Sequence, residues 1–135
     1  MDDRYTLLLV DDERDVRSAL RRTLYVPGYT IYEANDGKEA LEVLRDVEVD
    51  AIVTDYDMPR MDGMTLLQKI RIFRPEMVRI LITARGDMNV AVRAINEGAV
   101  HRFLLKPWDR IDVRGIVQMA LHQKPDRVEA IREVS

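Results

Sequence analysis

The sequence contains no cysteine, which excludes disulfides and thiolate metal sites. Long apolar runs are also missing, and a stretch such as Leu7–Val10 is far too short to cross a bilayer. The formal net charge is only −3, so there is no basic field to attract nucleic acid or anionic membranes. The first residues, 1–4, lack the basic region and apolar stretch of a signal peptide. These absences predict a cytoplasmic protein that binds neither nucleic acid nor membrane.

Apolar residues, in contrast, are plentiful enough for one domain core. Hydrophobic residues make up 47% and charged residues 33% of the 135 residues, which is typical of a globular protein. The length is close to the commonest size of a single domain. We therefore expect one domain over residues 5–122, followed by a linker or tail helix over residues 123–135, where Pro125 interrupts the last helix.

Short apolar runs alternate along the chain with amphipathic segments of helical period. The runs are Thr6–Val10, Thr30–Ala34, Ala51–Thr54, Val78–Thr83 and Arg102–Leu105. Several are apolar throughout, as is typical of strands that are buried on both faces. Asp36 and Asp62 are placed to cap the second and third helices, and Gly98 to end the fourth. Five strand–helix units in series predict an α/β fold in which helices cover both faces of a parallel sheet.

Polar residues stand where four of the predicted strands end, at the edge of the sheet where such folds bind ligands. They are Asp11, Asp12, Asp55, Thr83 and Lys106. Three carboxylates in one crevice would repel one another, and a divalent cation would remove that cost. Oxygen donors without cysteine or a nearby histidine favour magnesium over zinc.

The remaining two side chains favour phosphoryl transfer. Lys106 supplies a positive charge and Thr83 a hydroxyl donor for phosphoryl oxygens, and one carboxylate can be the nucleophile. A single polar residue at a strand end commonly reflects only a solvated loop. Five such residues at matching strand ends favour a functional site.

Four segments of the chain resemble the receiver domains of bacterial response regulators in two-component and phosphorelay signalling. They are Leu9–Glu13, Asp55–Gly63, Thr83–Ala84 and Phe103–Pro107. The resemblance implies a flavodoxin-like (βα)5 fold with strand order 2-1-3-4-5. It also implies a phosphoprotein switch rather than an enzyme, because such a domain catalyses only its own phosphorylation and dephosphorylation.

The same resemblance implies a role for each residue of the cluster. Asp55 would be the phosphoacceptor, and Thr83 and Lys106 would hold the phosphoryl oxygens. The ligands of Mg²⁺, or of Mn²⁺ in its place, would be Asp11, Asp12, Asp55 and the backbone carbonyl of Asp57. The bond between Lys106 and Pro107 would be cis, a form that proline tolerates.

The resemblance also implies a switch and a tuning pair. Thr83 would move toward the phosphoryl group, and Phe103 would turn into the space that Thr83 vacates, with room left by the small Ala84. A plain core position for Phe103 is an equal alternative. The change would be transmitted through the face of the fourth helix, fifth strand and fifth helix to an output domain or a second copy. Asp57 and Arg85 would flank the phosphoryl group, and as an ion pair they would slow its hydrolysis.

The phosphoryl donor would be a sensor histidine kinase or a phosphotransfer protein. In this family the donor docks near the start of the first helix, where the candidate contacts are Arg14, Asp15, Arg17 and Ser18. The segment Leu105–Asp109 resembles receivers of multidomain regulators. Trp108 could pack on a loop or contact a partner, and we favour packing. We expect His101 and His122 to be solvated side chains without a chemical role.

Two alternatives remain at this stage. Asp55-Tyr56-Asp57 is a D-x-D motif, which haloacid-dehalogenase-type phosphatases also use, although they place it after the first strand. The second alternative is a degenerate receiver that only binds protein. Such a receiver would be expected to lack Asp55, Thr83 or Lys106, and all three are present.

Overall fold

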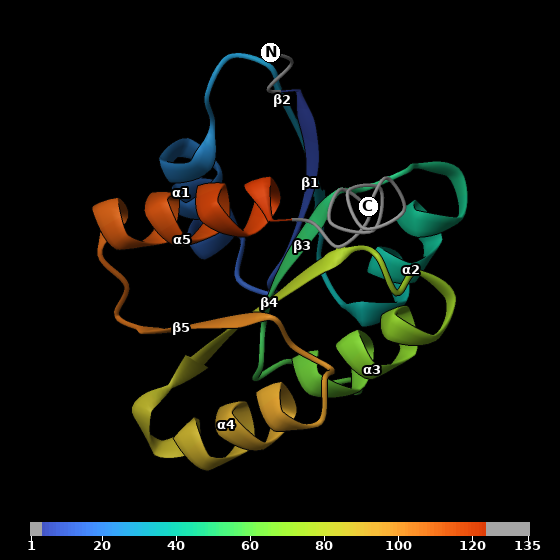
Figure 1. Ribbon diagram of the computed structural model, residues 1–135, viewed down its shortest axis with the longest axis vertical. Coiled ribbons are helices and arrows are strands. Elements are labelled where there is room, and N and C mark those ends of the chain that lie inside the picture. The colour runs from blue at the N-terminus through green and yellow to red at the C-terminus, as the bar shows by residue number, and fades with distance from the viewer. Residues whose placement is uncertain (1–3, 124–135) are drawn as a thin grey trace, which may run out of the picture.

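The computed structural model describes residues 4–123 and has five parallel strands connected by helices (Figure 1). The strands are β1 (Tyr5–Val10), β2 (Tyr29–Ala34), β3 (Ala51–Asp55), β4 (Val78–Ala84) and β5 (Arg102–Lys106). The helices are α1 (Arg14–Leu24), α2 (Gly37–Asp46), α3 (Gly63–Phe73), the 3-10 turn η1 (Arg85–Asp87), α4 (Met88–Asn96) and α5 (Arg110–His122). The sheet order is β2-β1-β3-β4-β5, which confirms the predicted flavodoxin-like α/β fold.

Local sequence signals account for most element boundaries. The side chains of Asp36 and Asp62 cap α2 and α3, where each accepts a backbone N–H at 2.8 Å. Gly98 follows α4 with a φ of 83°, a conformation that favours glycine. Each predicted strand is found, and each is longer by a single residue than expected.

Helices cover both faces of the sheet. In Figure 1, α1 and α5 lie side by side over one face, and α2, α3 and α4 cover the other. Alternate residues of β1 point to opposite faces: Leu7 and Leu9 belong to the core under α1 and α5, and Leu8 and Val10 to the core under α2, α3 and α4. Both cores are buried, so the middle strands are covered on both sides.

A buried arginine lies near the start of β4, at the edge of the sheet away from the acidic cluster. Arg79 is only 3% exposed, and its guanidinium lies against backbone carbonyls of the loops that follow α3 and α4. It donates hydrogen bonds to the backbone carbonyls of Arg74, Pro75, Met77, Gly98 and Ala99. Burial lowers the pKa of Arg79 to about 10, so the group stays charged at neutral pH.

His101 lies next to this arginine, and the expectation that it is a solvated side chain is wrong. It is partly buried, and its Nδ1 atom accepts the backbone N–H of Arg79 at 3.0 Å. Burial and the charges of Arg79 and Arg102 lower the pKa of His101 to about 4. The imidazole is therefore neutral at pH 7 and forms part of the β4–β5 packing. His122 is exposed, and its ring centroid lies 6.0 Å from that of Tyr5.

No helix within residues 4–123 is long and apolar enough to span a bilayer. Apart from Gln123, the predicted linker or tail helix over residues 123–135 lies outside the described residues.

Candidate functional site

The polar residues predicted at the strand ends meet at one edge of the sheet. The neighbouring strands β1, β3, β4 and β5 deliver Asp11, Asp12, Asp55, Thr83 and Lys106 to this edge. Parallel pairing keeps the ends level, because Val10 pairs with Thr54 and Thr83 pairs with Leu105. The sheet topology therefore builds the site from segments that are far apart in sequence.

Three carboxylates form the centre of the site. Asp11, Asp12 and Asp55 each offer an oxygen, and these oxygens lie within 4.8 Å of one another. Asp11 and Asp55 are 2% and 4% exposed, whereas Asp12 is exposed. Burial raises the pKa of Asp11 to about 6; the N–H of Glu13 opposes this rise, and the charges of Asp55 and Asp12 add to it. The cluster is therefore electrostatically costly unless a cation joins it.

One oxygen of Asp11 has no hydrogen-bond partner within residues 4–123. Its Oδ1 atom accepts the backbone N–H of Glu13 at 2.8 Å, but its Oδ2 atom is buried and unpaired. An unpaired buried carboxylate oxygen is expensive, and a cation or a water bound to that cation would satisfy it. The donor set is made of carboxylates with no histidine in the group, which fits magnesium.

Lys106 bonds to the buried carboxylate of β3. Its Nζ atom lies 2.8 Å from Oδ1 of Asp55. Burial acts to lower the pKa of Lys106, but the hydrogen bond and charge of Asp55 outweigh burial and raise it. For Asp55 burial is the largest effect, so its pKa is raised despite Lys106. The bond between Lys106 and Pro107 is cis, as the resemblance implies.

Thr83 and Phe103 lie on the neighbouring strands β4 and β5. Thr83 is 1% exposed, and its hydroxyl donates a long hydrogen bond of 3.4 Å to the carbonyl of Ala84. Phe103 is partly buried and packs against the core under α2, α3 and α4. Because Thr83 pairs with Leu105, Phe103 lies two residues along β5 on the same face of the sheet as Thr83.

The predicted pair of Asp57 and Arg85 is not formed in this structure. Both residues are exposed, and the salt bridges among the described residues join other partners. Opposite charges on two exposed loops attract only weakly, because water screens them. The structure therefore leaves Asp57 and Arg85 exposed and not joined to each other.

One contact of the acidic cluster was missed by sequence reasoning. The sequence offers Arg17 only as a candidate contact for the phosphoryl donor, but its Nη1 atom donates to the backbone carbonyl of Asp11 at 2.6 Å. The amphipathic pattern puts Arg17 on the polar side of the helix, and it contains no signal that distinguishes a solvated arginine from one that reaches back to the preceding loop.

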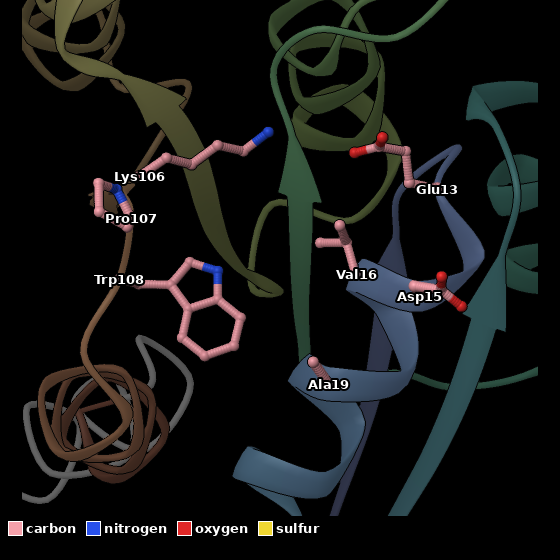
Figure 2. A pocket seen from close by; sticks show the side chains of 7 residues that line it. All are labelled: Glu13, Asp15, Val16, Ala19, Lys106, Pro107 and Trp108. Atoms are coloured by element: carbon pink, nitrogen blue, oxygen red, sulfur yellow. The ribbon is translucent and has the colours of Figure 1, made fainter.

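A groove was missed as well, and Figure 2 shows it beside the site. It encloses about 570 Å³ between α1 and the loop that joins β5 to α5. The lining residues are Glu13, Asp15, Val16, Ala19, Lys106, Pro107 and Trp108. Trp108 is partly buried and packs against the core under α1 and α5, which confirms the expectation that it packs.

A match to a known protein family agrees with the fold and with the cluster at the strand ends. The profile described as "Response regulator receiver domain" matches residues 7–118. The chain belongs to the response regulator receiver domain family. Among curated relatives of this receiver domain, the C4-dicarboxylate transport transcriptional regulatory protein DctD of Rhizobium meliloti is 38% identical over 103 residues, which are 76% of this chain and 22% of that protein.

Another relative is the response regulator MprA of Mycobacterium leprae. It is 36% identical over 121 residues, which are 89% of this chain and 53% of that protein. The receiver domain thus spans about half or less of these curated relatives.

Solved structures agree with the family match. The signal receiver domain of an HD domain-containing protein from Pseudomonas fluorescens has a TM-score of 0.85 and 35% identity, and the alignment covers 96% of this chain and 95% of that one. A structure named adenylate cyclase from Rhodopirellula baltica has a TM-score of 0.88 and 31% identity, with 97% and 96% covered.

The family match decides between the functional classes. The chain is a response regulator receiver domain of two-component signalling, a class that interacts with kinases and output domains, and it does not belong to a classical enzyme family. The D-x-D motif at Asp55 follows β3, and Asp11 and Asp12 follow β1, so the arrangement differs from that of the phosphatase alternative.

Proposed function

We propose that Asp55 is the phosphoacceptor of this receiver domain. The observation that carries the proposal is the position of its carboxylate, which is buried at the end of β3, 2.8 Å from Lys106 and within 4.8 Å of two further carboxylates. A nucleophile in such a place has the ammonium of Lys106 beside it and is shielded from bulk water.

In the forward reaction, an oxygen of Asp55 attacks the phosphorus of a phosphohistidine. The P–N bond breaks, the donor imidazole leaves with the electron pair and takes up a proton, and an acyl phosphate forms. In the reverse half of the cycle, water attacks the phosphorus, the P–O bond to Asp55 breaks, and the free carboxylate and inorganic phosphate result. The domain therefore catalyses only its own modification and its reversal.

The residues proposed to hold Mg²⁺, or Mn²⁺ in its place, are Asp11, Asp12, Asp55 and the backbone carbonyl of Asp57. When bound, the ion would neutralise charge on the carboxylates and on the phosphoryl oxygens. Lys106 and the hydroxyl of Thr83 would hold the remaining phosphoryl oxygens. The position of the Lys106 ammonium, 2.8 Å from Oδ1 of Asp55, supports this role.

The proposed switch couples Thr83 to Phe103. Movement of the Thr83 hydroxyl toward the phosphoryl group costs little, because its present hydrogen bond to Ala84 is long at 3.4 Å. Phe103 would turn into the space that Thr83 leaves. The signal would then reach an output domain or a second copy through the face formed by α4, β5 and α5. We propose that Asp57 and Arg85 tune the lifetime of the acyl phosphate.

We propose a sensor histidine kinase or a phosphotransfer protein as the donor. In the groove between α1 and the β5–α5 loop, Val16 and Ala19 of α1 lie across from Trp108 of the loop, and Lys106 also lines the groove (Figure 2). Arg14, Asp15 and Ser18 are the remaining candidate contacts at the start of α1. Kinases that use cytoplasmic ATP are the natural source of the phosphoryl group, so we place the domain in the cytoplasm.

The test uses acetyl phosphate as a small donor, with intact mass as the readout. Wild type should gain the mass of one phosphoryl group only when magnesium is present, and Asp55→Asn should gain none. Asp46→Asn is the matched control, because Asp46 is an exposed carboxyl at the end of α2. A folded wild type that gains no mass with magnesium would instead support a receiver that only binds protein.

A further inference from the structure

Arg17 of α1 is held in one place by three acceptors. Its Nη1 atom donates to the backbone carbonyl of Asp11 at 2.6 Å and to Oδ1 of Asn35 at 3.3 Å. Its Nε atom donates to Oε1 of Glu33 at 3.0 Å. The side chain is only 13% exposed. Through these contacts the guanidinium links α1 to the end of β1 and to the end of β2.

Glu33 fixes the orientation of this guanidinium. Its two oxygens accept from Nε of Arg17 and Nη1 of Arg21, both at 3.0 Å. Burial acts to raise the pKa of Glu33, but the hydrogen bonds and charges of the two arginines outweigh burial and lower it. The carboxylate is therefore charged at neutral pH, and a charged pair with several hydrogen bonds has a well-defined geometry.

The contact restrains Asp11 at the centre of the acidic cluster. The backbone carbonyl of Asp11 accepts from Arg17, and its backbone N–H donates to the carbonyl of Ala34 at 3.3 Å. Its side-chain Oδ1 accepts the N–H of Glu13. With these three groups engaged, the buried Oδ2 is the one Asp11 oxygen without a hydrogen-bond partner among the described residues, and an oxygen of Asp11 lies within 4.8 Å of oxygens of Asp12 and Asp55.

We propose that Arg17 is a positioning residue for divalent-cation binding, because it clamps the backbone of Asp11 and so holds the β1–α1 loop in the geometry that presents its carboxylates to the ion. This inference rests on the proposed magnesium site. Loss of a group that orients a metal ligand through a hydrogen bond typically costs about 10–100-fold in metal affinity or activity. The same contacts remove Arg17 from the candidates for partner docking, because its guanidinium is engaged inside the protein.

Arg21 is a matched control on the same helix. It makes the same kind of salt bridge to Glu33, but its Nη1 atom donates to the backbone carbonyl of Ile31 at 3.0 Å rather than to that of Asp11. Replacement of either arginine removes one positive charge and one salt bridge to Glu33. The contact with the acidic loop is lost only when Arg17 is replaced.

The experiment is isothermal titration of the full chain with magnesium, for wild type, Arg17→Ala, Arg17→Lys and Arg21→Ala. Folding of each is checked by circular dichroism. We expect the dissociation constant for magnesium to rise about tenfold or more in Arg17→Ala. It should stay within about twofold of wild type in Arg21→Ala, where the ligands are untouched. The dissociation constant of Arg17→Lys should lie between those of wild type and Arg17→Ala. Lysine keeps the charge, but it cannot donate to Asp11 and Glu33 at the same time as the planar guanidinium does.

Each outcome decides a separate question. If wild type binds no magnesium, the proposed function itself is wrong. If wild type binds and Arg17→Ala binds equally well, or if Arg21→Ala is weakened as much as Arg17→Ala, the positioning role is overturned. Should Arg17→Ala not fold, Glu33→Gln weakens the same anchor from β2, and an unchanged dissociation constant in that folded variant would overturn the proposal too.

Discussion

The Nδ1 atom of His101 accepts the backbone N–H of Arg79 at 3.0 Å, and this bond joins the start of β5 to the start of β4. The bond requires a neutral imidazole, because protonation would turn Nδ1 into a donor facing another donor. It would also place a second positive charge beside the buried guanidinium of Arg79.

This relationship predicts that His101 weakens the protein in acid. The pKa of His101 is about 4 in the folded protein and about 6.5 in an unfolded chain, so its contribution is complete above about pH 6.5 and is lost as pH falls to about 4. His101→Asn keeps an acceptor but does not titrate. As pH falls from about 7.5 to about 4.5, wild type should therefore lose about 1–2 kcal/mol more of its free energy of unfolding than His101→Asn does.

The measurement is urea unfolding of both proteins at each pH. The difference between the two proteins is the relevant quantity, because Asp11 affects both in the same way. A difference that does not change with pH would show that His101 is not protonated on unfolding.

A second prediction concerns the charge of the acidic cluster without metal. The pKa of Asp11 is about 6 in the folded protein against about 4 in the unfolded chain, so stability falls as pH rises through this range and stays low above it. In the presence of a chelator at about pH 7.5, Asp11→Asn should be more stable than wild type by about 1–2 kcal/mol.

Magnesium should reverse that order, because an ion that binds only the folded protein stabilises it, and Asp11→Asn has lost a proposed ligand. Thermal or urea unfolding with and without magnesium checks both halves. A chelated Asp11→Asn that is less stable than wild type would contradict the electrostatic account.

A third prediction uses two glycines that differ in their surroundings. A Cβ at Gly63 would collide with the carbonyl oxygen of Asp55, so Gly63→Ala must displace the end of β3. We expect a loss of about 2–3 kcal/mol in the free energy of unfolding, together with impaired phosphorylation.

Gly115 is the matched control, because a Cβ there meets nothing within 4 Å in the middle of α5. Gly115→Ala should stabilise the protein by about 0.5–1 kcal/mol through helix propensity alone. Equal effects of the two substitutions, measured by urea unfolding, would mean that α3 does not approach Asp55 so closely.

A fourth prediction concerns the ammonium that contacts Asp55. Lys106→Met removes the cation proposed to hold a phosphoryl oxygen, and phosphorylation by acetyl phosphate should slow by about 10–100-fold. Lys69→Met is the control, because Lys69 is exposed on α3 and away from the cluster. The rate of mass gain with excess magnesium is the readout, and an unchanged rate in Lys106→Met would exclude a role for the ammonium.

Sequence alone was sufficient for much of this molecule, wherever the signal is local. Asp36 and Asp62 cap helices through hydrogen bonds to residues three positions away. The apolar runs form buried strands because their side chains are apolar on both faces of the strand and are kept out of water. The strand-end positions of Asp11, Asp55 and Lys106 were predictable too, because parallel strands place their carboxyl ends at one edge.

Only the tertiary structure decided which side chains meet across elements. The sequence places Arg17 on a polar helix face and His101 before a strand, but the contacts with Asp11 and Arg79 depend on how α1 and β5 pack on the sheet. The absence of an Asp57–Arg85 salt bridge and the groove between α1 and Trp108 have the same origin. Composition and periodicity determine which residues are buried, whereas the directions of long polar side chains are set by acceptors that only the folded chain brings within reach.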